Sequence, residues 1–277
     1  MLIAFALTAG FMLVEVVGGL ISGSLALLAD AAHMLTDAGA LALAWFAFRI
    51  ARRPADSKRS YGYHRGQVLA AFVNGGVLVA IVFWIFFEAI QRLQSPVAVE
   101  GTLMLAVAAV GLAVNIVAFF VLHGGDRDNL NMRGAAAHVL GDLLGSAAAI
   151  IGALVILATG WMPIDPLLSM LVGLLVLRSA WLVVRESAHI LLEGTPATIE
   201  PRDLRQALMS DIPDLEDVHH IHAWSLTTEM PLVTLHAQVC ETADTQAVLT
   251  RIKQVLSSRF GIDHSTVQIE RGRCGDD

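Results

Sequence analysis

Long apolar runs in the first two-thirds of the chain are the feature that most limits what this sequence can fold into. The 277 residues are 56% hydrophobic and only 16% charged, with a mean hydropathy of +0.65, whereas an ordinary soluble domain carries about 25% charged residues. The runs lie within residues 1–192, and the mixed texture of a soluble domain begins at residue 195. The sequence therefore predicts a membrane part followed by a soluble part.

Six of these runs are long enough to cross a membrane, because a helix needs about 20 apolar residues to span the hydrocarbon core. Turn-forming residues separate them, as in "SGS" at 22–24 and "GWMPIDP" at 160–166. We expect the first run to be a membrane helix rather than a cleaved leader, since no positively charged region precedes it. The expected spans are residues 2–22, 27–50, 66–93, 99–122, 132–160 and 164–190.

The Lys and Arg residues of the short loops predict the orientation of the spans. The second loop and its flanks contain Arg49, Arg52, Arg53, Lys58, Arg59 and Arg65, and the fourth loop contains Arg127 and Arg133. The first and fifth loops have neither Lys nor Arg. Because basic loops stay in the cytoplasm, we expect both termini to be cytoplasmic, in a multi-pass protein of a bacterial inner membrane.

The end of the chain is expected to form a cytoplasmic domain of residues 194–277, after a six-helix membrane domain of residues 1–193. Gly and Pro in "LLEGTP" (191–196) end the sixth helix. The pattern then predicts a helix, two strands, a helix and a strand, at about 200–211, 217–227, 231–240, 244–259 and 264–271. This αββαβ order indicates a small α+β domain with its helices on one face of the sheet.

Two near-copies of one motif place His and Asp four residues apart within the apolar runs. They are "AAHMLTD" at 31–37 and "AAHVLGD" at 136–142. Residues i and i+4 share a helix face, so the side chains of each pair point the same way. Each pair lies about ten residues into its span, which at 1.5 Å per residue is near the bilayer midplane. The copies lie on oppositely directed helices, a pattern typical of the inverted repeats of transporters.

Two imidazoles and two carboxylates at one depth suit a tetrahedral divalent ion such as Zn²⁺, and they suit thiolate-preferring metals less well. The ligands are His33, Asp37, His138 and Asp142. Protons and metal compete for them, because each ligand binds metal only when deprotonated. A metal/proton antiporter needs that competition. The alternative is structural: each His bonds a neighbouring backbone group, and each Asp caps or pairs locally.

Other polar residues of the spans are expected to support packing. Asp30 shares the face of His33 and Asp37 nearer the outer surface, and we expect it to be an entrance or packing residue. Four more are expected to form interhelical hydrogen bonds, with a proton or ion path as the alternative: Glu15, Asn74, Glu88 and Asn115.

These motifs resemble the cation diffusion facilitator family, in particular the zinc-transporting branch that includes bacterial zinc exporters and animal vesicular zinc transporters. The matching segments are "SGSLALLADAAHMLTD" (22–37), "YGYHRGQVLAA" (61–71), "AAAHVLGDLLGS" (135–146), "LLEGTP" (191–196), "VHHIHAWSL" (218–226) and "HSTVQIE" (264–270). The resemblance implies a homodimeric, proton-coupled exporter of Zn²⁺ whose cytoplasmic domain is ferredoxin-like, binds metal and dimerises. The family's transport ligands map to His33, Asp37, His138 and Asp142.

A second metal site is expected in the cytoplasmic domain. Strand alternation places His236 and Glu270 on the polar sides of their strands, and His222 and His264 are placed to converge with them. By resemblance, these four residues match the cytoplasmic zinc site of the zinc-transporting branch. Our hypothesis is that zinc bound there is regulatory and favours one arrangement of the dimer. The alternative is a solvated face of titratable residues.

The remaining histidines and cysteines of this domain are expected to be less important. His219 and His220 are adjacent, so a regular strand would point them to opposite faces. Either one can join the site, and we do not expect both to do so. Cys240 and Cys274 form no CxxC pair, and we expect them to be bystanders.

Other classes of function fit less well. The net charge of −7 is not the basic balance of a nucleic-acid-binding protein. An intramembrane metalloprotease would show HExxH, which is absent from the sequence, so we expect a secondary transporter rather than an enzyme. A membrane receptor that senses metal without transporting it stays open at this point.

Overall fold

The computed structural model describes residues 2–35, 39, 49, 55–123, 130–272 and 274, with side chains except those of residues 2–9, 118–123 and 130–142. The chain divides into two compact units. The helical unit comprises Met1–Trp45 and Ala70–Val184, and the sheet unit comprises Phe46–Leu69 and Arg185–Asp277.

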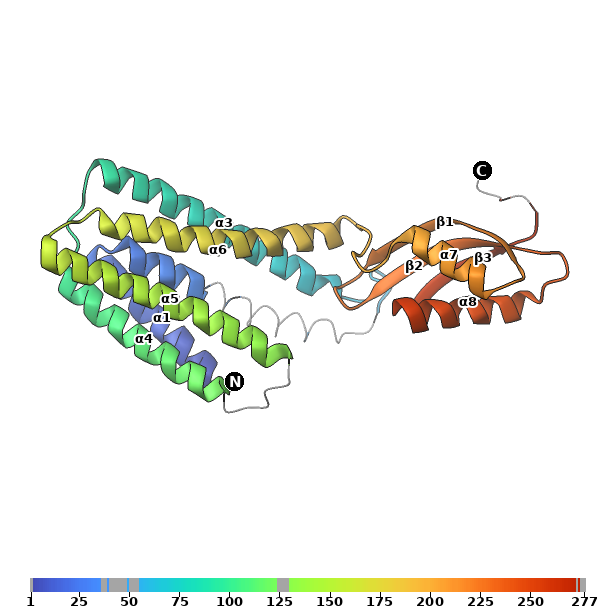
Figure 1. Cartoon of the computed structure of the whole chain (residues 1–277), viewed down its shortest axis with the longest axis horizontal. Helices are drawn as coiled ribbons and strands as arrows, with labels where there is room; N and C mark the ends of the chain where they lie inside the picture. The colour runs from blue at the N-terminus through green and yellow to red at the C-terminus, as the bar shows by residue number, and fades with distance from the viewer. Residues whose placement is uncertain are drawn as a thin grey trace. The chain divides into compact units, whose positions relative to one another are not determined.

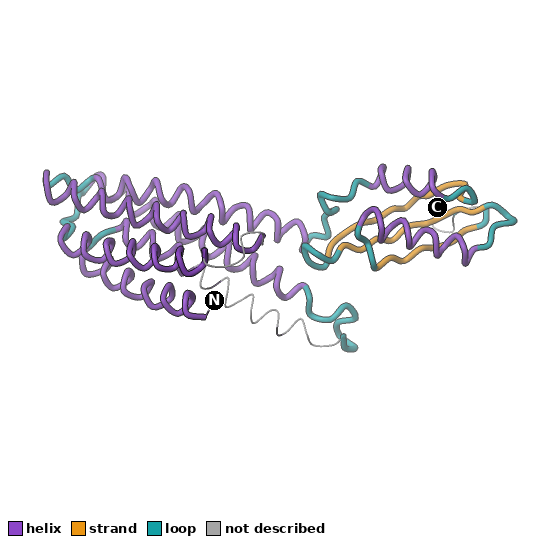
Figure 2. Tube along the Cα trace, turned by 60° about the horizontal axis from the view of Figure 1, so that its bottom comes forward, coloured by secondary structure: helices purple, strands orange, loops and turns teal. Residues whose placement is uncertain are grey.

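Long helices form the helical unit and run side by side (Figures 1 and 2). They are α1 (Leu2–Ser22), the helix Leu25–Leu35, α3 (Arg65–Gln94), α4 (Gly101–His123), α5 (Leu130–Thr159) and α6 (Ile164–Leu191). The bounds of the five labelled helices fall within a few residues of the predicted spans. The second predicted span is described as far as Leu35, so the count of six spans stays a prediction.

Two helices among the described residues, α3 and α6, are long and apolar enough to cross a membrane. Large apolar side chains lie exposed along them: Phe83, Trp84 and Phe87 of α3 are 59%, 52% and 62% exposed. An extended exposed apolar surface of this kind is typical of contact with lipid or with another apolar surface.

The helix Leu25–Leu35 packs on two sides. Leu27 and Met34 belong to an apolar cluster with residues of α1, α4 and α5. Leu25 and Ala29 belong to a second cluster with residues of α3 and α6. This helix is thus held between both groups of helices, and close packing on both faces fixes its rotation.

The sheet unit has the αββαβ order that the sequence predicts. It contains α7 (Pro201–Asp211), β1 (Leu215–Ser225), β2 (Pro231–Val239), α8 (Thr245–Phe260) and β3 (His264–Glu270). The sheet order is β1-β2-β3, with β1 antiparallel to β2 and β2 parallel to β3. Figure 1 shows α7 and α8 beside the three strands.

Both helices cover the same face of this sheet, as predicted. α7 packs on β1 and on α8, and α8 packs on β3. Leu204 and Leu208 of α7 meet Ile252 and Leu256 of α8 in one core, and all four are fully buried. Asp244 caps α8, because its side chain accepts the N–H groups of residues 246 and 247.

Candidate metal sites

The structure describes part of the predicted site in the membrane helices. His33 lies on the helix described over Leu25–Leu35 and is partly buried. Asp37 lies outside the described residues. His138 and Asp142 lie four residues apart on α5, where the backbone alone is described. The joining of these four residues in one site therefore stays a prediction.

A buried carboxylate from another helix fixes the start of the helix that carries His33. Asp165, in the first turn of α6, is fully buried and accepts the Leu25 N–H at 2.8 Å and the Ala26 N–H at 3.1 Å. It also accepts the Ser24 hydroxyl at 2.6 Å, and Arg92 lies 3.9 Å away. These N–H groups have no partner within their own helix, so Asp165 acts as a cap supplied across the fold. Sequence reasoning placed Asp165 in a turn and missed this role.

Asp30 links the same helix to α5. The Ser146 hydroxyl of α5 donates to Asp30 Oδ2 at 3.5 Å, and Asn115 Nδ2 of α4 donates to Ser146 Oγ at 3.3 Å. All three side chains are buried. Gly145 allows this approach, because a Cβ there would lie 2.3 Å from Asp30 Oδ1. The packing role predicted for Asp30 and the interhelical hydrogen bond predicted for Asn115 are both present.

The helix Leu25–Leu35 and α5 run in opposite directions. The carbonyl of Ser22, just before the first helix, accepts the Glu100 N–H at 2.8 Å. The next residue, Gly101, lies against Leu157 near the end of α5. The start of one helix therefore lies beside the end of the other. Further along the two helices, Asp30 contacts Ser146. One helical turn beyond that contact, residues 33–34 of the first helix lie at the level of residues 142–143 of α5.

In the sheet unit, four side chains bring possible metal ligands together. His219, His220, His236 and Cys274 each offer a ligand atom, and these atoms all lie within 4.8 Å of one another. The carboxylate of Glu270 adjoins them: Oε1 is 2.9 Å from His236 Nδ1, and Oε2 is 3.2 Å from His219 Nε2. Of the predicted set, the structure thus brings His236 and Glu270 together.

A bulge in β1 explains why both adjacent histidines join this cluster. The β1–β2 register shifts between His219 and His222, and His220 has a φ of 47°. An extra residue in a strand breaks the alternation of faces. The rings of His219 and His220 consequently lie 5.5 and 4.9 Å from the His236 ring. The expectation that these neighbours point to opposite faces is wrong for this reason.

The donor set fits a zinc ion. Nitrogen and thiolate ligands bind Zn²⁺ at about 2.0–2.3 Å. The four ligand atoms lie within 4.8 Å of one another, so a small movement toward a common centre would let them bind one ion. Within the described chain, the two buried ring nitrogens of partly buried His219 and the buried Oε2 of Glu270 have no hydrogen-bond partner, although they lie at ion-pair distance from their neighbours. Buried polar atoms without hydrogen bonds are costly, and a bound cation would satisfy them.

Neighbouring side chains keep the carboxylates of this cluster ionised. Burial acts to raise the pKa of Glu270, but hydrogen bonds from Gln268 and Cys274 and the nearby histidines outweigh it, so its pKa lies below the usual value. A hydrogen bond from Arg205 at 2.6 Å lowers the pKa of Asp217. Asp217 lies 3.2 Å from His219 Nδ1, the position from which a carboxylate orients a metal-bound histidine.

Two residues of the predicted set lie elsewhere in the sheet unit. His222 lies beyond the bulge and lines a cavity with Trp224, and the exposed His264 ring packs edge-on against Tyr61 at 5.7 Å. Neither contributes to the cluster around His236. Sequence reasoning therefore missed the convergence of His219 and His220 and the proximity of Cys274. The only sequence signal was the polar pair His219–His220, which interrupts the alternation of a strand.

Comparison with known proteins identifies the family. The cation efflux transmembrane domain matches residues 1–192, and the cation efflux protein cytoplasmic domain matches residues 196–272. The chain belongs to the cation efflux family. The predicted resemblance to the cation diffusion facilitators is thereby confirmed, as is the combination of a transmembrane domain with a cytoplasmic domain that contains a small sheet.

Curated relatives of this cation efflux protein match along nearly the whole chain. Zinc transporter ZitB of Pectobacterium atrosepticum is 52% identical over 100% of this chain and 87% of its own. ZitB of Escherichia coli is 50% identical over 99% of this chain and 88% of its own. The cadmium, cobalt and zinc/H(+)-K(+) antiporter of Bacillus velezensis is 40% identical over 98% of this chain and 87% of its own.

Proposed function

We propose that this protein is a proton-coupled antiporter that exports Zn²⁺, and divalent cations of similar coordination, from the cytoplasm. The observation that carries the proposal is 52% identity over the whole chain with a protein named as a zinc transporter. Membership of the cation efflux family supports a membrane transporter rather than an enzyme. The name of the Bacillus velezensis relative supports coupling to protons.

The proposed transport site consists of His33, Asp37, His138 and Asp142. The antiparallel course of the two helices supports it, since the turn after Asp30 and the turn before Ser146 lie at one level. Two carboxylates balance the charge of Zn²⁺ in the apolar bilayer. Protons that reach the ligands from the non-cytoplasmic side of the membrane displace the ion, because metal and proton compete for the same atoms.

The proposed architecture is six spans with both termini in the cytoplasm of a bacterial inner membrane. The membrane domain covers residues 1–193, and the cytoplasmic domain covers residues 194–277 with a ferredoxin-like arrangement. The basic loops support this orientation. We propose a homodimer, supported by the match of residues 196–272 to the cytoplasmic domain of cation efflux proteins.

In the cytoplasmic domain we propose a regulatory zinc site. His219, His236 and Glu270 are its best-supported ligands, with His220 and Cys274 beside them. The roles of His222 and His264 as ligands stay predictions of the resemblance. Zinc regulates transport here only if the two states of the dimer bind it with different affinity. A double variant, His236→Ala with Glu270→Ala, is therefore expected to change how flux depends on cytoplasmic zinc, and an unchanged dependence would contradict regulation.

Zinc flux into proteoliposomes tests the proposed transport. The purified chain is reconstituted with an acidic interior and a trapped zinc dye, and zinc is added outside. We expect uptake that stops when an ionophore collapses the pH gradient, and we expect no uptake by the variant Asp142→Ala. Absence of flux with the unmodified chain would contradict a transporter and favour a metal-sensing receptor. Uptake that ignores the pH gradient would contradict antiport.

A further inference from the structure

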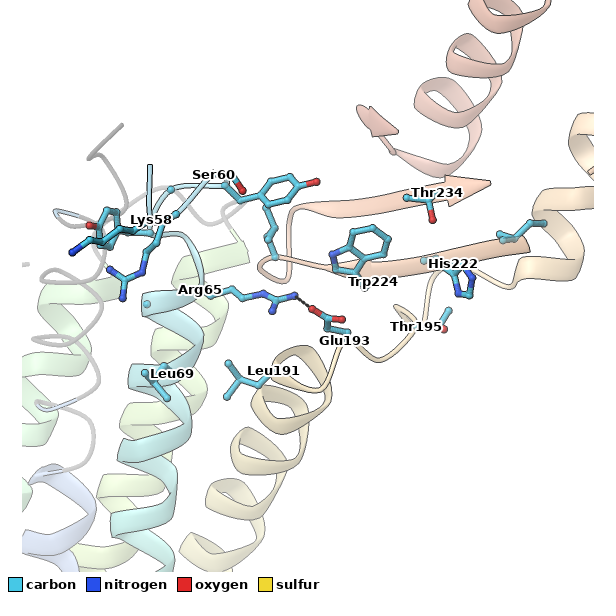
Figure 3. Close-up of a pocket in the computed structure, with 18 residues that line it drawn as sticks. Lys58, Ser60, Arg65, Leu69, Leu191, Glu193, Thr195, His222, Trp224 and Thr234 are labelled. Carbon is cyan, nitrogen blue, oxygen red and sulfur yellow. Dashed lines mark hydrogen bonds and ion pairs between the residues drawn. The ribbon is translucent and has the colours of Figure 1, made fainter. Parts of the chain in front are cut away.

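A cavity of about 880 Å³ lies in the sheet unit, and all of the residues that line it belong to that unit. One wall is the segment of residues 58–66, which leads into α3, and β1 and β2 form another (Figure 3). His222 is the one histidine among its described lining residues. Apart from His222, which the resemblance assigns to the cytoplasmic zinc site, no residue of the two proposed metal sites is among these lining residues. A single histidine does not make the cavity a further metal site.

The cavity carries a net positive charge. Among the described lining residues are three cationic side chains and one carboxylate: Lys58, Arg59, Arg65 and Glu193. The carboxylate is already engaged, because Arg65 Nη2 donates to Glu193 Oε1 at 3.1 Å (Figure 3). Over the described ranges of the chain, Lys58 and Arg59 form no ion pair. Two exposed cations are thus available to an anion.

A folded turn presents these two cations. The carboxylate of Asp56 accepts the N–H groups of Lys58 and Arg59 at 2.8 Å each, and the Tyr63 hydroxyl donates to it at 2.8 Å. The Arg59 guanidinium lies over the Tyr63 ring, 4.5 Å from its centroid. Asp56 therefore accepts backbone and hydroxyl donors, and the side chains of Lys58 and Arg59 do not lie at ion-pair distance from it.

Apolar and aromatic groups share the lining with the cations. Leu69 of α3, which is 53% exposed, and Leu191 at the end of α6 both contribute (Figure 3). Both leucines lie on helices that, within the described part of the chain, are long and apolar enough to cross a membrane. Tyr61 and Trp224 also line the cavity, and such rings are frequent at the level of lipid headgroups. The lining therefore suits a ligand with an anionic head and an apolar tail.

We propose that this cavity binds the headgroup of an anionic phospholipid. Lys58 and Arg59 contact the phosphate, and Leu69 and Leu191 lie beside the first part of the acyl chains. Basic residues close to a span are attracted to anionic lipids, and this cavity adds a defined shape to that attraction. The proposal concerns binding alone, so it stands or falls independently of zinc transport.

A calorimetric titration tests the proposal on the full chain in detergent. The probes are dihexanoyl-phosphatidylglycerol, dihexanoyl-phosphatidylcholine and glycerol phosphate. We expect the phosphatidylglycerol to bind at least about tenfold more tightly than the other two, since each basic residue near an anionic headgroup contributes about fivefold. The double variant Lys58→Gln with Arg59→Gln is expected to bind both lipids equally.

A charge-matched variant provides the control. Arg251 and Lys253 are exposed on α8 and do not line the cavity, so Arg251→Gln with Lys253→Gln is expected to keep the preference. Equal binding of both lipids by the unmodified chain would overturn the proposal. Loss of the preference for phosphatidylglycerol in the control variant would overturn it as well. Glycerol phosphate binding as tightly as the lipid would show that a soluble phosphate is the ligand and would also overturn it. Circular dichroism checks that each variant keeps its fold.

Discussion

The two histidine-bearing regions follow different geometric rules. In the proposed transport site, His and Asp are expected to share a helix face because they lie four residues apart, and that spacing is visible in the sequence. In β1, His219 and His220 approach the same neighbour although a regular strand would separate them. In a helix, the spacing of two residues in the sequence therefore predicts reliably whether their side chains share a face. In a strand, one inserted residue moves the side chains that follow it to the opposite face.

The two regions also differ in what holds them. The helix of His33 is packed on both faces and capped by buried Asp165. The cytoplasmic cluster lies around the bulge of β1, an edge strand of the sheet, where bulges are frequent. We infer that the helical site is rigidly positioned and that the cytoplasmic cluster adjusts more easily when it binds metal.

The largest expected effect concerns the cytoplasmic cluster. Removing a residue that only hydrogen-bonds to a metal ligand changes metal affinity by about 10–100-fold. The double variant His219→Ala with His236→Ala removes two ligands, so its zinc affinity at this site is expected to fall by at least about 100-fold. Competition with a chromophoric chelator measures zinc affinity on the full chain. Tight zinc binding equal to that of the unmodified chain would show that the cluster holds no zinc.

A glycine in α5 tests how tightly the helical region is packed. A Cβ at Gly145 would lie 2.3 Å from Asp30 Oδ1, so Gly145→Ala is expected to lower the free energy of unfolding by about 1–3 kcal/mol. Thermal unfolding in detergent measures it. Gly76 of α3 has no atom within 4 Å of an added Cβ, and Gly76→Ala is the control, with a change below about 1 kcal/mol. Equal unfolding midpoints for the two variants would contradict the close packing.

Replacing one nitrogen ligand of the proposed transport site by oxygen tests what sets its metal preference. Imidazole suits zinc, and carboxylate suits a wider set of cations. We expect His33→Asp to retain transport while its preference for zinc over cadmium falls by about tenfold. Parallel flux measurements with the two metals give the ratio. An unchanged ratio would remove His33 from the selectivity of the site.

The smallest expected effect separates the predicted ligand set from the observed one. His222 and His264 lie away from the cluster, so His222→Ala and His264→Ala are each expected to change its zinc affinity by less than about twofold, as for independent sites. The same chelator competition applies. A loss of zinc affinity as large as that of the double variant His219→Ala with His236→Ala would restore the set predicted from the sequence.

Helix and strand order in the sheet unit was predictable from the sequence, because apolar periodicity and the Gly and Pro residues mark each element. The pairing of His236 with Glu270 was likewise predictable from strand alternation. The bulge was not predictable, because position 220 is a histidine and not a glycine, the residue type that signals a positive φ. The cap by Asp165 was also hidden, since its contact with Leu25 joins residues 140 positions apart.

We propose that His33 of the membrane domain binds the transported ion and that His219 of the cytoplasmic domain does not. Zinc flux of His33→Ala and His219→Ala, reconstituted at equal density under the same pH gradient, tests it most directly. We predict that His33→Ala loses at least about tenfold in flux, because a four-ligand zinc shell loses one member. We predict that His219→Ala stays within about threefold at saturating zinc, because it acts only on the balance of states. Full flux in His33→Ala together with abolished flux in His219→Ala would show that His33 is not needed for transport and that His219 is.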